Sequence, residues 1–167
     1  MLVNIRRMIE SDIEAIHQCF IDQGWNKDLD TLKRYYSEQE LYERKVFIAH
    51  DKDRILGYAT LLPYAPFGPF KNMNMPIVVD LNVFLRCQKQ GIGTHIMDAI
   101  EAHVKTYARH IGLACGLHQG YGAAQRLYVK RGYVPDGTGI WYQDKPVEPY
   151  GPCMNDDDLV IYLSKKL

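Results

Sequence analysis

The chain has 167 residues, of which 47% are hydrophobic, and its 20 basic side chains balance its 20 acidic ones. This length suits a single domain, residues 1–167, with a core of its own. The balanced charge gives no sign of a nucleic-acid or membrane partner, and no stretch approaches the roughly 18 apolar residues of a membrane span. We therefore expect a cytoplasmic protein.

The N-terminal part contains two predicted helices. Ser11 and Glu14 have the spacing of a capping box, in which both side chains accept hydrogen bonds from free backbone N–H groups. Asp28 or Asp30 can cap a second helix. Apolar residues at helical spacing predict the buried faces, with Ile13, Ile16, Phe20 and Trp25 in the first segment and Leu32, Tyr36 and Leu41 in the second.

The remaining chain alternates between strands and helices. Apolar runs predict strands at residues 3–8, 46–49, 55–62, 77–84, 113–117, 133–134, 140–142 and 159–163. A long helix is expected from Ile92, and another over residues 123–131 with Gly132 as its stop. This order predicts an α/β protein with a mixed sheet of six to seven strands, flanked on both faces by about four helices.

A glycine-rich turn joins the strand that ends near Leu85 to the helix that begins at Ile92. The segment GIGTHIM lacks the Lys-Ser/Thr pair of the GxxxxGK[ST] phosphate loop, and the third glycine of a dinucleotide motif would fall on Ile96. What remains is a run of backbone N–H groups at a helix N-terminus, where a partial positive charge can bind phosphate. The alternative is an ordinary turn before a helix.

Two spaced motifs resemble the GNAT family of N-acetyltransferases. The first is Leu81-x-Val83-x-Leu85-x-x-Gln88-x-x-Gly91-x-Gly93. The second, AQRLYVKRGY at residues 124–133, is similar to the family's A-x-x-L-Y-x-x-x-G-F/Y segment. The sequence departs from the family at three positions, where a proline, an asparagine and a glutamate are replaced by Leu85, Tyr121 and Ile77.

The resemblance implies a GNAT-like acyl-CoA N-acyltransferase fold, with acetyl-CoA as donor and an amine of a small molecule or peptide as acceptor. It assigns the CoA pyrophosphate to the backbone N–H groups of Gln88, Lys89, Gln90, Gly91, Ile92, Gly93 and Thr94. The pantetheine arm would pair with the backbone of Leu81, Asn82 and Val83 like an added strand. Tyr128 would protonate the departing thiolate. The alternative interpretation is that Tyr128 is a core tyrosine on an apolar helix face, without a catalytic role.

The proton acceptor for the amine is open among Asp80, His118 and a water chain. An aspartate inside an otherwise apolar strand is unusual, although it could simply form hydrogen bonds on a solvent-facing side. His118 follows the fifth predicted strand, and a neutral imidazole can accept a proton at pH 7. The alternative is that this histidine, like most loop histidines, is an ordinary polar residue of the surface.

Other functions stay open beside this one. A catalytically inactive acyl-CoA-binding regulatory module would keep the donor site, and an O-acyltransferase or a longer-acyl transferase would keep the fold. The four cysteines are scattered without a CxxC pair, which is typical of reduced thiols, and no HExxH motif predicts a metal site. A monomer and a homodimer are both compatible with the sequence.

Overall fold

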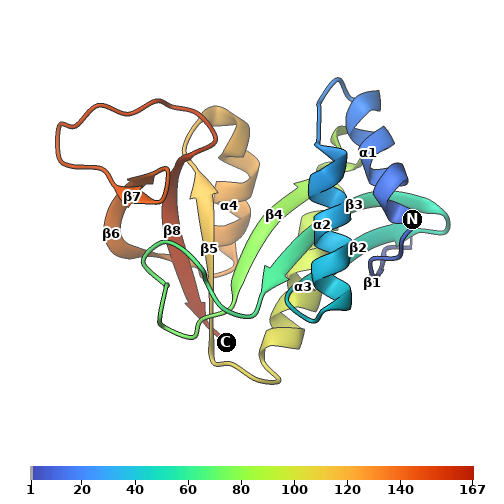
Figure 1. Ribbon diagram of the computed structural model, residues 1–167, viewed down its shortest axis with the longest axis horizontal. Coiled ribbons are helices and arrows are strands. Elements are labelled where there is room, and N and C mark those ends of the chain that lie inside the picture. The colour runs from blue at the N-terminus through green and yellow to red at the C-terminus, as the bar shows by residue number, and fades with distance from the viewer. Residues whose placement is uncertain (1) are drawn as a thin grey trace. The chain divides into compact units, whose positions relative to one another are not determined.

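The computed structural model describes residues 2–167, which form an α/β protein with eight strands and four α-helices. The strands follow the order β1-β2-β3-β4-β5-β8-β6-β7 in one mixed sheet (Figure 1). The predicted fold class is confirmed. The sheet has one strand more than the largest expected number, seven, and includes the two-residue strand β7, which the sequence did not predict. The chain divides into two compact units, one reaching up to Leu62 and including Val79–His103, the other combining Pro63–Val78 with Val104–Leu167.

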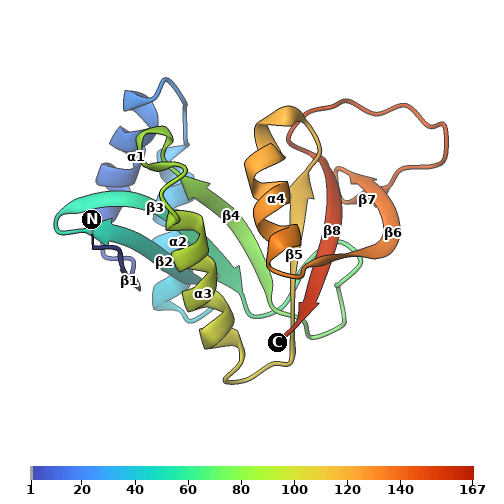
Figure 2. The ribbon, with the colours of Figure 1, turned by 180° about the vertical axis from the view of Figure 1, so that it is seen from behind.

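The first unit packs helices against both faces of antiparallel strands. Its elements are β1 (Asn4–Arg7), α1 (Asp12–Asp22), α2 (Leu29–Glu40), β2 (Lys45–Asp51), β3 (Arg54–Leu62), most of β4 (Ile77–Val83), η1 (Leu85–Cys87) and nearly all of α3 (Ile92–Val104). Helices α1 and α2 lie on one face of these strands and α3 on the other, as the opposite views in Figures 1 and 2 show. Its core is formed by fully buried side chains of the strands and of the helices on both faces, such as Leu56 on β3, Ile16 on α1 and Ile96 on α3.

The second unit includes the loop at residues 63–76 and the first two residues of β4. Its other elements are β5 (His110–Gly116), η2 (Gln119–Tyr121), α4 (Gly122–Lys130), β6 (Val134–Tyr142), β7 (Lys145–Pro146) and β8 (Leu159–Lys166). Strand β8 pairs antiparallel with both β5 and β6. The loop at residues 63–76 packs Phe70 edge-on against Tyr162, with ring centroids 5.6 Å apart.

Strand β6 replaces two short strands of the prediction. One strand spans both apolar runs, and its register with β8 shifts between Pro135 and Ile140. Gly137 and Gly139 lie within this break at φ 91° and 81°, a region that residues with a Cβ rarely adopt. Period-2 patterning cannot detect a strand that continues through such an interruption.

The first helix begins where expected, but without the expected cap. Ser11 has helical backbone angles and makes no capping hydrogen bond, so the capping-box prediction is wrong. The side chain of Asp12, the first residue of α1, instead binds the chain that precedes the helix: it accepts from the backbone N–H of Ile9 at 2.8 Å and from both terminal nitrogens of Arg6 at 2.6 and 2.7 Å. Hydrogen bonds between charged groups, such as those from Arg6, are stronger than those between neutral groups.

The predicted helix faces are partly correct. Ile13, Ile16, Phe20 and Leu32 are buried as expected. Trp25 and Leu41 are 47% and 66% exposed because both lie beyond the helix ends, and Tyr35 is buried in place of Tyr36. Asp28 caps α2 by accepting from the N–H of Asp30. Among residues 2–167, no helix combines the length and apolar composition that a membrane span needs.

Candidate active site

The turn before α3 presents six consecutive backbone N–H groups, those of Lys89 to Thr94, that have no acceptor within residues 2–167. Gln88 differs from the expectation, since its N–H donates to the carbonyl of Leu85 at 3.3 Å. Lys89 and Gly91 have left-handed backbone angles, φ 59° and 80°, and alternating conformations of this kind can turn successive N–H groups into one concave surface. The start of α3 adds the positive end of the helix dipole.

Two glutamine side chains hold this turn in place. The Gln88 amide donates to the carbonyl of Val83 at 3.1 Å, and the Gln90 amide donates to the carbonyl of Arg86 at 3.1 Å. The first bond ties the turn directly to the end of β4. Since a Cβ at Gly91 would have only the ring of His95 within 4 Å, the space above this residue is open.

Strand β4 contains a sharp break at Asp80. This residue has φ 60° although its neighbours are extended, and the register of β4 with β5 covers only Ile77 and Val78. Leu81, Asn82 and Val83 follow the break. They lie close to β3, where the carbonyl oxygen of Asn82 approaches Gly57 so closely that a Cβ there would lie 2.5 Å away.

The Asp80 carboxylate is the centre of a cluster of four hydrogen-bond donors. Its Oδ2 accepts from Lys27 Nζ at 2.5 Å and from the hydroxyls of Tyr35 and Tyr58 at 3.0 and 2.9 Å. Its Oδ1 accepts from the Asn82 amide at 2.6 Å. Burial, followed by the charge of Asp80, raises the pKa of both tyrosines, which therefore remain donors at neutral pH.

A second polar group, formed by Arg44 and Thr60, contacts both the Asp80 cluster and the residue before Asp80. Arg44 is buried, lies 4.4 Å from the centre of the Tyr35 ring, and donates to Thr60 Oγ1 at 2.6 Å. Thr60 in turn donates to the carbonyl of Val79 at 2.9 Å. Burial opposes ionisation of Glu38, but hydrogen bonds from Arg44 and Arg34 outweigh it and lower the pKa of this carboxyl.

Sequence reasoning found Asp80 but did not connect this residue with its hydrogen-bond partners. Tyr58 stands inside an apolar run and Tyr35 on a helix, which are ordinary positions for core tyrosines. A buried hydroxyl requires a hydrogen-bond partner, so an apolar strand containing a tyrosine was the one available signal. Nothing near Lys27 in the sequence marks it out.

Tyr128 lies on α4 in the second unit and is 5% exposed. In the part of the chain that the structure describes, its hydroxyl has no hydrogen-bond partner. Burial, and then the nearby Cys115 and Tyr121, raise the pKa of Tyr128 well above 10.0, so the phenol keeps its proton at neutral pH. Burial likewise raises the pKa of the Cys115 thiol to about 11, which shows that this environment makes a thiol and a phenol weaker acids together.

His118 lies just before η2, and both of its ring nitrogens are engaged. Nδ1 accepts from the N–H of Gly120 at 3.0 Å, and Nε2 lies 2.9 Å from a carboxylate oxygen of Asp157. The hydrogen bond from His118, opposed in part by burial, lowers the pKa of Asp157. The imidazole would have to give up the Gly120 N–H before it could accept another proton.

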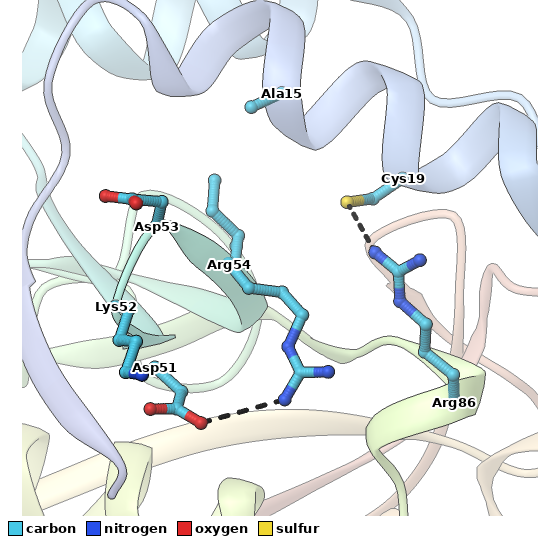
Figure 3. Close-up of a pocket in the computed structure, with 8 residues that line it drawn as sticks. Ala15, Cys19, Asp51, Lys52, Asp53, Arg54 and Arg86 are labelled. Carbon is cyan, nitrogen blue, oxygen red and sulfur yellow. Dashed lines mark hydrogen bonds and ion pairs between the residues drawn. The ribbon is translucent and has the colours of Figure 1, made fainter. Parts of the chain in front are cut away.

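A pocket of about 570 Å³ in the first unit contains none of the predicted site residues (Figure 3). It lies between α1, the β2–β3 turn and Arg86. Arg86 donates to Cys19 Sγ at 3.6 Å, but burial outweighs that contact and raises the pKa of Cys19. This thiol is therefore not an activated nucleophile.

The comparison with protein families gives one match: the acetyltransferase (GNAT) domain, over residues 42–135. No curated protein sequence matches the chain significantly. Solved structures share its fold at low identity. A GNAT-family protein from Desulfovibrio desulfuricans has a TM-score of 0.73 at 16% identity, covering 99% of each chain.

Two further solved structures share the fold of this chain. A protein from Salmonella typhimurium, solved with its cofactor acetyl-CoA, has a TM-score of 0.67 at 16% identity and covers 98% of this chain and 93% of its own. The ribosomal-protein-S18-alanine N-acetyltransferase of Escherichia coli has a TM-score of 0.69 at 13% identity, with 99% and 94% covered. The family match spans more than half of the sequence, and we conclude that this chain belongs to the GNAT family of N-acetyltransferases, whose donor is acetyl-CoA.

Proposed function

We propose that the protein transfers the acetyl group of acetyl-CoA directly to an amine of a small molecule or peptide. The observation that carries this proposal is the run of six unpartnered N–H groups from Lys89 to Thr94, which suits a pyrophosphate. The backbone of Leu81 to Val83 then pairs with the pantetheine arm as an added strand. An N–H of this segment polarises the thioester carbonyl.

The reaction requires three proton transfers. The acceptor ammonium loses one proton to Asp80, and its nitrogen lone pair then forms the bond to the acetyl carbon. As the carbon–sulfur bond breaks, Tyr128 gives its proton to the thiolate, and the phenolate left behind takes the second proton of the acetylated nitrogen. The products are an amide and free CoA, and the proton held by Asp80 is the one net proton released. We assign the acceptor role to Asp80 rather than His118, because Asp80 directly precedes the segment assigned to the pantetheine arm.

A matched pair of glycine variants tests the phosphate-binding turn. Gly91→Asp places a carboxylate at the turn, where repulsion of about 4 kcal/mol between unit charges at 4 Å predicts more than about 100-fold weaker acetyl-CoA binding. Gly139→Asp is the control, since Gly139 has nearly the same φ, 81° against 80°, and has open space around it. Calorimetric titration with acetyl-CoA measures both. Equal affinity in the two variants would refute the assignment.

The Tyr128→Phe variant tests the general acid. We expect kcat to fall on the order of 100-fold with the acetyl-CoA dissociation constant unchanged, because the phenol acts only when the thiolate forms. Release of CoA thiol is followed with polyamines, amino acids and alanine-terminated peptides as acceptors. An unchanged rate contradicts the role of Tyr128, whereas acetyl-CoA binding without turnover on any amine favours the inactive binding module.

A further inference from the structure

The Asp80 carboxylate already holds a primary ammonium, that of Lys27. The two groups are 2.5 Å apart, and Lys27 Nζ also lies 5.8 Å from the centre of the Tyr35 ring. A carboxylate beside an aromatic face is a combination that recognises organic cations in general. The side chains of Lys27 and Asp80 are 22% and 15% exposed, so water reaches the pair.

The lysine side chain can leave without disturbing the chain around it. The carbonyl of Lys27 is fixed by a 2.8 Å hydrogen bond to His17 Nδ1, and only the flexible four-carbon stem carries the ammonium to Asp80. When the ammonium leaves, the carboxylate keeps Tyr35, Tyr58 and Asn82 as donors. The partly buried charge is therefore never without hydrogen bonds.

We propose that Asp80 and Tyr35 form the subsite for the acceptor's ammonium, which Lys27 occupies until an acceptor displaces it. This rests on the function proposed above, since Asp80 directly precedes the segment assigned to the pantetheine arm. The acceptor class is a linear primary alkylammonium, because the subsite already holds the end of a lysine side chain. A lysine residue and a polyamine both present this group.

The size of the effect follows from competition between the tethered ammonium and the free one. The apparent dissociation constant of a ligand equals its intrinsic value divided by the fraction of protein open to it. If Lys27 closes the subsite about nine-tenths of the time, its removal lowers the KM for the acceptor about tenfold. The donor site is unaffected.

The test compares variants at saturating acetyl-CoA, with spermidine and Nα-acetyl-lysine amide as acceptors. Lys27→Gln should lower the acceptor KM several-fold and Lys27→Arg should restore it, while Asp80→Asn should raise it. Lys33→Gln is the control, because Lys33 is exposed and forms an ion pair with Asp30 at 3.7 Å. The KM for acetyl-CoA should stay constant throughout the lysine variants.

An acceptor KM that is unchanged or higher in Lys27→Gln overturns the proposal, as does turnover confined to alanine-terminated peptides. If the wild-type protein does not bind acetyl-CoA at all, the proposed function is refuted instead. If acetyl-CoA binds but no amine turns over, titration of the CoA complex with spermidine decides the subsite. Tighter binding to Lys27→Gln than to the wild type supports it, and equal binding refutes it.

Discussion

Replacing Gly57 by alanine should push β3 and β4 apart at the segment assigned to pantetheine. The new Cβ would lie 2.5 Å from the carbonyl oxygen of Asn82 and 3.1 Å from the Cα of Val83, and both are backbone atoms that no rotamer change can move. Restoring an ordinary contact of 3.4 Å requires the strands to separate by about 0.9 Å, the difference between 3.4 and 2.5 Å.

Overpacking of this kind destabilises a protein by about 1–3 kcal/mol. The reduced entropy of the unfolded chain offsets about 0.4–1 kcal/mol of that, so we expect Gly57→Ala to lose about 1 kcal/mol of unfolding free energy, and at most about 2.6 kcal/mol. Acetyl-CoA should also bind more weakly, because the backbone of Asn82 and Val83 moves. Urea unfolding and calorimetric titration measure the two effects.

The same substitution at Gly122 is the control and should have the opposite sign. Gly122 begins α4 with helical angles, φ −55° and ψ −40°, and has nothing within 4 Å of an added Cβ. Alanine there should stabilise the protein by about 0.4–1 kcal/mol. If Gly57→Ala proves as stable as the wild type and binds acetyl-CoA equally well, the close approach of β3 to β4 does not constrain this segment.

Two further changes test the packing of the first unit. Asp12→Ala removes a buried carboxylate that accepts from the N–H of Ile9 and pairs with Arg6, so urea unfolding should show a loss of about 1–3 kcal/mol, with Asp12→Asn intermediate. Equal stability of all three proteins would contradict a stabilising role for this carboxylate. Burial and the charge of Lys45 lower the pKa of His103 below 6.5, so the unfolded state takes up a proton first as the pH falls. The contribution of His103 to the free energy of unfolding is therefore fully present above pH 6.5 and is lost as the pH falls below that value. His103→Gln should flatten this decline in melting temperatures measured between pH 7.5 and 5.5, and an unchanged slope would contradict the assignment.

The glycine-rich turn before α3 could be predicted because its signals are local. A strand pattern, two glycines and a helix pattern follow one another within residues 77–104, and the turn geometry depends on those residues alone. The start of α3 at Ile92 was correct for this reason. The 3₁₀ turn at Leu85–Cys87 was missed, since three residues are too few to give a periodic signal.

The cluster around Asp80 could not be predicted because its members are far apart in the sequence. Lys27, Tyr35 and Tyr58 precede Asp80 by 53, 45 and 22 residues. Each has an ordinary environment when only its neighbours in the chain are considered. Their shared partner emerges from the packing of α2 and β3 against β4, which no periodicity describes.

Asp80 explains why an acidic residue interrupts an apolar strand. A left-handed conformation costs an ordinary residue about 1–2 kcal/mol, and aspartate, asparagine and glycine tolerate it best. Glycine would allow the break but would leave the hydroxyls of Tyr35 and Tyr58 without their acceptor. Asparagine would keep the backbone and one acceptor oxygen but would give Lys27, or an ammonium in its place, no charge to pair with. Only aspartate supplies both the break and the anion. One residue, Asp80, therefore sets the direction of the backbone at Leu81 to Val83 and holds the ammonium of Lys27.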